Sequence, residues 1–524
     1  MNRLISLFFV LILMSACARV GNPTGGDKDE TPPVLIKSIP SDAQVNYKNK
    51  EIILYFDEYV TFKDLQKNIM ISPPPTSFPS ISPTGIASKV FKIKFKDSLN
   101  PNTTYIINFG ESIQDYNEGN KLKHLRLVFS TGTDIDSLQL KGKVNFAHFD
   151  KKPENVIVGL YKKKDYYDSI VFREKPFYIT PVDKNGQFSF THLKEGVYVP
   201  IAIADETGDY KYQSKKEAIG FIDKAIAIPR DSIFSISIFK EKQPTNIKQI
   251  IQVSANHIKI GYKGNAKEIV IEPEQVVNTS LVTGKQAIHF WYRSKRDSIK
   301  LVVKTPKREK EYRRKRIHKK DTLLSLNISN TRKHNPLDIV LIKANIPLQK
   351  YDSLKIELLQ DSLSVPYKLV PTKNHAFTLI FDKQFGTKYQ LKLLPGAIID
   401  FLNHKNKDTI VRSIDIPKKN TYGNLIVDVK NQDQLPVYIE LLNEQNKLVK
   451  KSKTQTSSNF MFKYLVPGKY HLRLVLDTNN NNKWDTGNYL QHKQAEKSLE
   501  FPSNIEVRAN WDINQSLDLS SYQK

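Results

Sequence analysis

The chain has 524 residues, of which 80 are Lys or Arg and 54 are Asp or Glu, so its formal net charge is +26. A single cysteine excludes an internal disulfide framework. The positive balance favours anionic partners such as lipid head groups, acidic polysaccharide or nucleic acid. A chain of this length is too long for one hydrophobic core, so we expect several domains.

The first sixteen residues have the layout of a secretory signal peptide. Arg3 supplies a positive charge, an apolar run from Leu4 to Met14 follows, and Ser15-Ala16 stand directly before Cys17. A helix needs about 20 residues to cross the hydrocarbon core of a bilayer, and this run is shorter. The pattern therefore predicts a cleaved signal peptide rather than a permanent membrane span.

The residues around Cys17 resemble the lipobox of bacterial lipoproteins, in which the cysteine thiol carries lipid and the chain is cut just before it. The resemblance implies cleavage after Ala16 and lipidation of Cys17, the sole thiol of the chain. Several acyl chains on one residue would anchor the protein stably in a membrane. The alternative is an ordinary signal peptide followed by an unrelated cysteine.

Residues 17–32 are predicted to form a lipidated tether, because glycines, prolines and charges alternate there and disfavour packing. Within the tether, Lys28-Asp29-Glu30 resembles the charged tag that sends some Gram-negative lipoproteins to the outer cell surface. We therefore expect a lipid anchor in the outer membrane, with the cell surface favoured over the periplasmic face. Export also removes the chain from the genome, so no nucleic acid partner is expected.

Period-two alternation predicts short, half-buried strands along the whole chain. In residues 91–96 apolar side chains alternate with lysines, which places them on opposite faces of a strand. Similar runs occupy residues 52–56, 125–129, 299–303, 354–358 and 425–429. Turns rich in Asn, Asp, Gly, Pro and Ser separate them. The fold class predicted is all-β, as a string of about five sandwiches arranged as a rod or a cluster.

Two internal repeats support this division. Segments 188–198 and 460–470 both read Phe-x-Phe-x-x-Leu-x-x-Gly-x-Tyr, and the match continues to Asp205 and Asp477. We interpret the glycine as the residue that permits a tight turn. A looser repeat relates residues 52–115 to residues 381–400 and their surroundings. Each pair is predicted to share a fold.

Residues 31–133 resemble the SbsA-type bacterial Ig-like domain, on the motifs Thr31-Pro32-Pro33, Phe56-Asp57-Glu58 and Phe129-Ser130-Thr131-Gly132. The segments 188–198 and 460–470 look like the transthyretin (prealbumin) or carboxypeptidase-regulatory type of β-sandwich. Both families are non-catalytic modules, so the resemblance implies a structural or binding role.

The predicted organisation follows in chain order. It comprises a signal peptide (1–16), a tether (17–32), an SbsA-type Ig-like domain (33–133), a transthyretin-like sandwich (134–243), a sandwich of unclear kinship (244–333), a second Ig-like domain (334–418) and a second transthyretin-like sandwich (419–519).

An asparagine-rich loop at residues 477–488 is a candidate calcium site. Its oxygen-bearing groups follow the ligand order of an EF-hand loop. They belong to Asp477, Asn479, Asn481, Lys483 (through its carbonyl), Asp485 and Asn488. The loop lacks the usual glycine and the bidentate glutamate, so the predicted affinity is weak, about 10⁻⁴ to 10⁻³ M. The alternative is a plain asparagine-rich turn, and no other cofactor is expected.

The densest basic segment, residues 304–320, is a candidate polyanion-binding site. The residues proposed to contact the polyanion are Lys307, Arg308, Arg313, Arg314, Lys315 and Arg316. The alternative is a solvated loop or a hairpin between strands.

The sequence predicts no enzyme. It contains no His-Glu-x-x-His and no Gly-x-Ser-x-Gly motif. His289 lies in an aromatic segment that could stack on sugars or pack in a core. The function predicted is a non-catalytic, lipid-anchored scaffold of the cell envelope, with envelope proteins as possible partners. The alternatives are a surface lipoprotein that binds polysaccharide or another polyanion and, after it, an unrecognised hydrolase.

Overall fold

The computed structural model describes residues 29–149, 151–230, 233–274, 278–284, 286–294, 296–315, 317, 319–329, 336–372, 376–430, 436–453, 459–501 and 504–519. The predicted signal peptide, Ala16, Cys17 and most of the tether lie outside these residues. Within them the chain is all-β, as predicted. Its helical elements are α2 (Leu65–Asn68) and the 3₁₀ turns η1 (Lys163–Asp165), η2 (Asp168–Phe172), η3 (Ala266–Glu268), η4 (Ser353–Lys355) and η5 (Lys419–Thr421).

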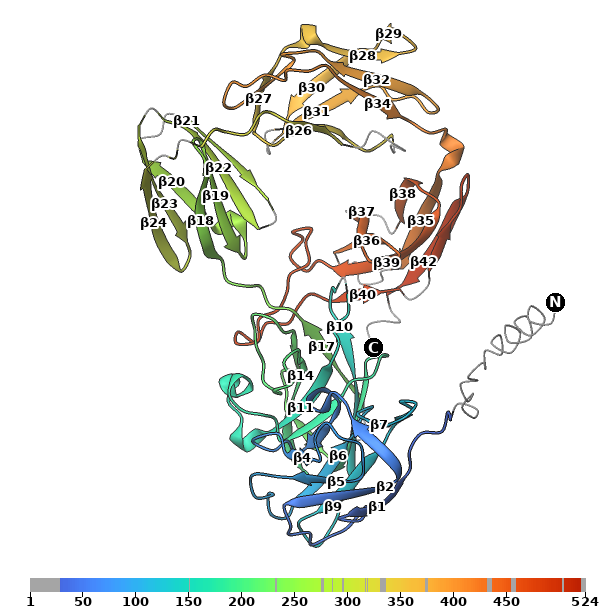
Figure 1. Ribbon diagram of the computed structural model, residues 1–524. Coiled ribbons are helices and arrows are strands. Elements are labelled where there is room, and N and C mark those ends of the chain that lie inside the picture. Colours follow the sequence, from blue (N-terminus) through green and yellow to red (C-terminus); the bar gives the residue numbers. More distant parts are fainter. Residues whose placement is uncertain are drawn as a thin grey trace, which may run out of the picture.

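Strand pairing arranges the chain in five sandwiches, coloured from blue to red in Figure 1. The first contains β1 (Leu35–Ile39), β2 (Glu51–Phe62), β3 (Met70–Ser72), β4 (Ser80–Ser82), β5 (Ser88–Lys94), β6 (Thr104–Asn108), β7 (Ile113–Asp115), β8 (Lys121–Leu122) and β9 (Arg126–Ser130). Its two sheets, β4-β5-β2-β7-β8 with β1 on β2, and β3-β6-β9, enclose one apolar core. The alternation predicted in β5 is confirmed, because Phe91 and Ile93 are buried while Lys92 and Lys94 are exposed.

The second sandwich contains β10 (Leu138–Phe146), β11 (Val156–Lys162), β12 (Tyr178–Pro181), β13 (Gln187–Leu193), β14 (Gly196–Ala204), β15 (Ile219–Phe221), β16 (Ile226–Ile228) and β17 (Phe234–Phe239). These strands form one sheet in the order β12-β11-β14-β15-β17-β10-β13, with β16 on β14. Because β12 and β13 adjoin in sequence but lie at opposite ends of this order, the sheet curls around the core and almost closes between them.

The third sandwich contains β18 (Asn246–Ser254), β19 (His257–Lys263), β20 (Val270–Glu274), β21 (Asn278–Thr283), β22 (Ala287–Arg293), β23 (Ser298–Thr305) and β24 (Arg308–Lys315). The sheet β18-β19-β22-β21 packs on the sheet β20-β23-β24.

The fourth sandwich contains β25 (Leu326–Ile328), β26 (Val340–Ala344), β27 (Leu348–Tyr351), β28 (Ile356–Gln360), β29 (Leu363–Ser364), β30 (Tyr367–Pro371), β31 (Phe377–Phe381), β32 (Lys388–Leu393), β33 (Ile398–Asp400) and β34 (Ile410–Asp415). The fifth contains β35 (Gly423–Lys430), β36 (Val437–Asn443), β37 (Leu448–Lys453), β38 (Asn459–Leu465), β39 (Gly468–Leu476), β40 (Ser498–Glu500), β41 (Ile505–Val507) and β42 (Asp512–Asp518).

Both internal repeats are repeats of strand topology. In the second sandwich β10 pairs with β13 antiparallel and with β17 parallel, and in the fifth β35 pairs in the same way with β38 and β42. The order β3-β6-β9 of the first sandwich recurs as β28-β32-β34 in the fourth. Strand pairing does not set the residue at which one domain passes into the next, so the predicted domain limits stay a prediction.

The glycine of the tighter repeat has another role than the one predicted. The left-handed residues are His192 (φ 57°) in β13 and Tyr464 (φ 56°) in β38, where the strand register shifts, whereas Gly196 and Gly468 begin the strands β14 and β39. A Cβ atom on Gly196 would lie 3.2 Å from the ring of Tyr198, whereas one on Gly468 would lie 3.9 Å from the ring of Tyr470. The first copy therefore uses its glycine to make room for the tyrosine, and the second copy has space for a Cβ atom there.

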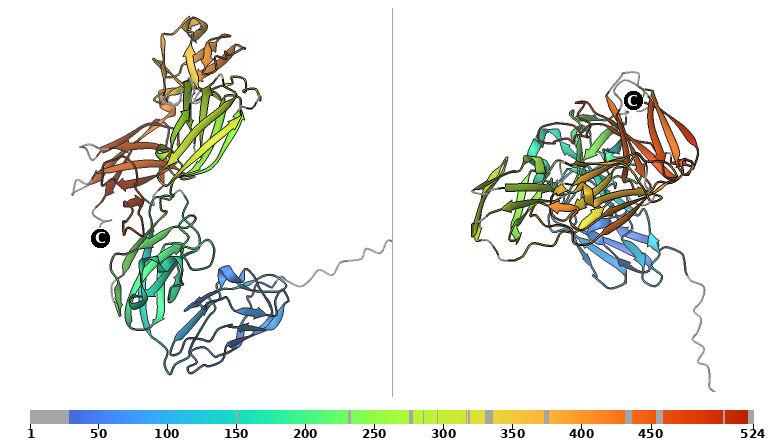
Figure 2. Two further views of the ribbon diagram at one scale, coloured as in Figure 1. Left: turned by 90° about the vertical axis from the view of Figure 1, so that its left-hand side faces the viewer. Right: turned by 90° about the horizontal axis from the view of Figure 1, so that it is seen from above.

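The five sandwiches form a cluster rather than an extended rod, because the fifth returns to the second (Figures 1 and 2). Trp291 of the third packs on Phe401 of the fourth, and Phe385 of the fourth packs on Tyr464 of the fifth. The path closes where Tyr489 of the fifth sandwich enters an apolar cluster of the second.

Candidate functional site

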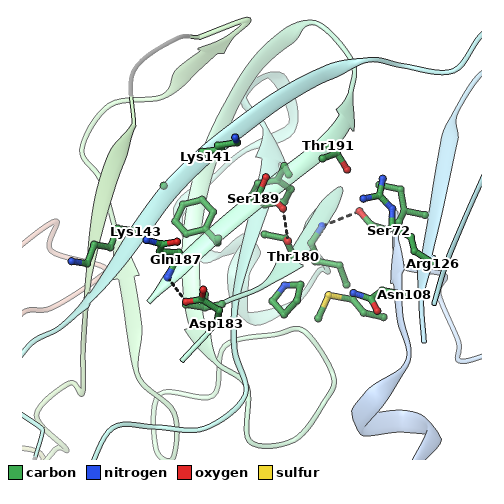
Figure 3. A pocket seen from close by; sticks show the side chains of 18 of the residues that line it. Ser72, Asn108, Arg126, Lys141, Lys143, Thr180, Asp183, Gln187, Ser189 and Thr191 are labelled. Atoms are coloured by element: carbon green, nitrogen blue, oxygen red, sulfur yellow. Dashed lines mark hydrogen bonds between the residues drawn. The ribbon is translucent and has the colours of Figure 1, made fainter. Parts of the chain in front are cut away.

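A cleft of about 880 Å³ lies between the first and the second sandwich. Strands β3, β6 and β9 of the first sandwich form one wall, and β10, β12 and β13 of the second form the rest. In Figure 3, Arg126 and Asn108 lie at one side of the cleft, Lys141 and Lys143 at the other, and Thr180 and Ser189 between them. This volume is in the range of small-ligand sites.

The cleft exists because β12 and β13 separate after their turn. At the turn Asp183 N–H donates to Gln187 O at 2.8 Å, and further along Thr180 Oγ1 donates to Ser189 O, also at 2.8 Å. From there β12 pairs with β11 while β13 pairs with β10. The gap between the two strands opens toward the first sandwich.

Hydrogen bonds fix the two walls relative to each other. Ile179 N–H donates to Ser72 Oγ at 3.1 Å, and Asp136 N–H donates to Thr104 Oγ1 at 2.9 Å. The Lys175 ammonium donates to the Pro75 carbonyl at 2.8 Å. A site between walls held in this way is formed before any ligand arrives.

The lining combines an apolar floor with a basic, polar rim. Phe188 and Phe190 point into the core and are almost fully buried, while Gln187 and Ser189 alternate with them and face outward. Among the described residues that line the cleft, the basic side chains are His124, Arg126, Lys141 and Lys143, and the acidic one is Asp183. Burial lowers the pKa of Arg126 from its usual value, against an opposing effect of the Asp42 carboxylate.

A second functional feature is the docking of the fifth sandwich on the second. Strands β11 and β14 are buried on both faces, and their outer face forms a cluster with Tyr489 that Trp484 and Ala495 flank. Tyr489 N–H donates to Glu241 at 2.7 Å, and its hydroxyl lies 2.5 Å from the Tyr166 hydroxyl. The segment from Trp484 to Glu496, which we call the docking loop, therefore completes a core of another sandwich.

Contacts also run in the opposite direction. His148 and Phe149, which follow β10, lie against the β36-β39 face of the fifth sandwich. Arg473, 1% exposed, donates to Phe149 O at 2.7 Å and lies 3.4 Å from Glu440. Burial would raise the pKa of Glu440, but the hydrogen bond from His148 and the nearby cations outweigh it and lower that pKa.

The predicted calcium loop borders this docking loop. Asn479 and Asn481 each donate a side-chain amide to Asp485, at 2.5 and 2.6 Å, and Asp477 accepts from the backbone N–H of Asn481 and Asn482. The loop thus brings together Asp477, Asn479, Asn481 and Asp485.

Asn488 belongs to another turn, in which its side-chain oxygen accepts from Gln491 N–H. Lys483 contributes its backbone N–H to Asn481. Within the described residues, no group of three or more His, Cys, Asp or Glu side chains could hold a metal ion. Calcium binding through this mainly amide and carbonyl set stays a prediction.

The predicted polyanion segment is an exposed hairpin at a sheet edge. Lys307 lies at its turn, and Arg308, Arg313, Arg314 and Lys315 are exposed on β24, while Tyr312 anchors the strand in the core.

Salt bridges cover part of the same sheet, because Lys300 pairs with Glu274 at 2.8 Å and Lys304 with Glu272 at 2.8 Å. Arg316 lies outside the described residues. Polyanion binding at this hairpin stays a prediction.

His289 lies on the outer face of its sheet. Phe290 and Tyr292 alternate with it and fill the core, whereas Trp291 packs against the fourth sandwich. His289 Nδ1 is 2.9 Å from His257 Nε2, and His257 stacks on Trp291 with 3.9 Å between ring centroids. Burial, with the neighbouring His289, lowers the pKa of His257 to about 4. The aromatic segment therefore serves both the core and the contact between sandwiches.

Sequence reasoning did not find the cleft. Lys141 and Lys143 alternate on a strand as many surface lysines do, and Arg126, though near in sequence, belongs to the preceding sandwich. Only the docking of two sandwiches brings these three side chains to one cleft.

The helical elements among the described residues are all too short to span a membrane.

Comparison with known proteins identifies the first sandwich. Residues 29–131 match the bacterial Ig-like domain family. The match agrees with the resemblance of residues 31–133 to an Ig-like domain. No curated protein matches the chain.

Solved structures of an S-layer protein, a pilin and a biofilm protein align with most of the chain at low similarity. The S-layer protein rSbsC is 11% identical, with 91% of this chain and 67% of that chain covered and a TM-score of 0.17. The major pilin subunit BcpA of Bacillus cereus is 8% identical, with 72% and 98% covered and a TM-score of 0.15. The BSP domain of a biofilm associated protein is 8% identical, with 75% and 97% covered and a TM-score of 0.17. At such scores, the role of the chain must be argued from its own residues.

Proposed function

We propose that the protein is a lipid-anchored scaffold of the bacterial cell envelope, held through Cys17 in the outer membrane and exposed at the cell surface. Its role is to present a fixed arrangement of β-sandwiches to other envelope components. The observation that supports this most is the reciprocal docking of the second and fifth sandwiches, because a chain that buries Arg473 and Tyr489 between domains holds one shape.

Three further features agree with this proposal. The bacterial Ig-like domain lies next to the proposed tether. Sandwiches without disulfides depend on burial for their stability, and each of the five has its own apolar core. The signal peptide layout and the sole cysteine supply the proposed anchor.

The test combines lipid labelling with protease treatment of intact cells. Cells that express the wild type or Cys17→Ala are labelled with palmitate and then treated with protease. We expect label on the wild type alone, and loss of its full-length band on intact cells. A wild-type chain without label would contradict the anchor. A labelled chain that intact cells protect would contradict surface exposure.

A second function is the binding of a polyanion at the β23-β24 hairpin. It is supported by the exposed basic side chains at its turn and on its edge strand, Lys307, Arg308, Arg313, Arg314 and Lys315. The substitutions Arg308→Gln, Arg313→Gln and Lys315→Gln together should then weaken the binding of long polygalacturonate and reduce its salt dependence. Unchanged binding would contradict a role of the hairpin.

A further inference from the structure

We propose that the cleft between the first and second sandwiches binds an acidic oligosaccharide, a short glycan that carries carboxylates. This inference assigns a ligand class to a site that the scaffold role does not require. It rests on the charge of the cleft, on its fixed shape, and on the hydrogen bonds that its backbone groups already make.

The charge of the cleft favours an anion. Arg126 stands on one wall, and Lys141 and Lys143 stand on the strand β10 that forms part of the other (Figure 3). The acidic member of the lining, Asp183, already accepts hydrogen bonds from the backbone N–H groups of Asn185 and Gln187 at 2.9 and 2.7 Å. Its carboxylate is therefore held in its own turn and neutralises the rim only in part.

Arg126 is suited to recognise a carboxylate. A guanidinium can donate two parallel hydrogen bonds to one carboxylate, which gives direction as well as attraction. Arg126 is an exposed residue of β9, so a ligand in the cleft can reach its guanidinium, and partial desolvation lowers its pKa.

The size and fixed walls of the cleft suit a short oligosaccharide. The volume of about 880 Å³ is large enough for several sugar rings. Hydroxyl and amide side chains of the lining, those of Ser189, Gln187 and Asn108, can exchange hydrogen bonds with sugar hydroxyls. The bonds from Ile179 to Ser72 and from Asp136 to Thr104 hold the walls in place. The protein therefore loses little conformational entropy when the ligand binds.

The backbone groups that border the cleft already have hydrogen-bond partners, which disfavours an acidic peptide as the ligand. A peptide strand would bind by adding to a sheet edge, which requires edge N–H and C=O groups that can accept new partners. At β13 the backbone N–H and C=O of Gln187 already bond with Asp183, and Ser189 O accepts from Thr180. At β12 the N–H of Ile179 donates to Ser72. Side chains rather than strand edges therefore face the ligand.

The experiment measures binding of tetragalacturonate to the purified full-length chain by isothermal titration calorimetry, with maltotetraose as the neutral probe. We expect wild type to bind the acidic probe and not the neutral one. Replacing Arg126, Lys141 and Lys143 together by Gln should raise the Kd at least tenfold. The matched control, Lys343→Gln, Lys368→Gln and Lys388→Gln, removes the same number of charges from exposed positions of the fourth sandwich and should change the Kd less than threefold.

A second variant tests the space of the cleft without changing its charge. Ser189→Trp places a large ring on the exposed face of β13, so it should abolish binding of tetragalacturonate while leaving the melting temperature within a few degrees. Retained affinity in this variant would overturn the proposal.

Other outcomes would also overturn it. These are equal losses in the two charge variants, equal affinity for maltotetraose, no binding by wild type, and tighter binding of a tetraglutamate peptide than of tetragalacturonate. The lipid anchor is not needed for any of these measurements, so a failure of the cleft proposal and a failure of the proposed anchor can be told apart.

Discussion

His148 of the second sandwich stacks on Trp484 of the fifth, with 4.8 Å between ring centroids and 8° between ring planes. The two residues are 336 positions apart in the sequence, from 148 to 484. His148 Nε2 also lies 3.1 Å from Glu440, which in turn pairs with Arg473. One compact set of contacts therefore joins parts of the chain that the sequence places far apart.

Trp484→Ala should loosen this contact. The indole donates to Glu496 O at 2.8 Å and flanks the cluster around Tyr489, so its loss removes both a hydrogen bond and apolar contact. We expect the free energy of unfolding to fall by about 2 kcal/mol, less than in a full core because the ring is half-buried. Limited proteolysis should then cut within the docking loop. The matched control is Trp511→Ala, because Trp511 is 59% exposed. Equal effects of both substitutions would contradict the role of Trp484.

Arg473→Met should lower the free energy of unfolding by more than a change to an apolar side chain of similar size would by itself. The substitution leaves the carboxylate of Glu440 buried without its guanidinium, which costs about 3 kcal/mol for a buried pair. Adding Glu440→Gln should recover part of the loss, since the buried charge is then gone. Chemical denaturation measures both variants. Arg508→Met, at an exposed pair with Glu506, should cost less than about 0.5 kcal/mol. A double variant no more stable than Arg473→Met would contradict this account.

Stability should fall below neutral pH because of His257. Burial and His289 lower the pKa of His257 to about 4 in the folded chain, from 6.5 in the unfolded chain. Between these values the unfolded chain binds more protons, so the contribution is fully present above about pH 6.5 and is lost as the pH falls toward 4.

Between pH 7.5 and pH 5 the loss from His257 is up to about 2 kcal/mol. His257→Asn should remove this part of the pH dependence when unfolding is followed at both pH values. Replacement of the exposed His124 by Asn should not. An unchanged difference between the two pH values in His257→Asn would contradict the assignment.

The weak calcium site predicted at residues 477–488 has a measurable consequence. With a Kd near 1 mM, 10 mM calcium would stabilise the folded chain by about 1.4 kcal/mol. The increase in melting temperature should be absent in Asp477→Asn combined with Asp485→Asn, and magnesium should not reproduce it. A melting temperature that calcium leaves unchanged in wild type supports the asparagine-rich turn instead.

Local pattern predicted most of the strands, but at residues 354–358 it was partly wrong, because β28 begins at Ile356 and Leu354 lies exposed in the turn η4. Apolar alternation in residues 91–96 places Phe91 and Ile93 in a core, as found. Shared spacing also predicted the kinship of segments 188–198 and 460–470, because strand connectivity depends on the same inward residues.

The docking and the cleft depend on how whole sandwiches meet, and spacing within one sandwich does not contain that information. One signal was available. Residues 156–161 of β11 and 198–204 of β14 are apolar on both faces, which requires a cover for the outer face. The sequence does not say that residues such as Tyr489 supply that cover. Likewise, Lys141 and Arg126 converge only because β12 and β13 separate beside the first sandwich.

The most direct test of the closed arrangement is a distance measurement between the second and fifth sandwiches. Spin labels on cysteines introduced at the exposed turn residues Lys184 and Lys447, in a Cys17→Ser background, allow this by pulsed electron resonance because Cys17 is the sole native cysteine. Docking predicts one narrow distance distribution that Trp484→Ala broadens. A distribution that is already broad in the chain with native Trp484 would contradict the closed arrangement.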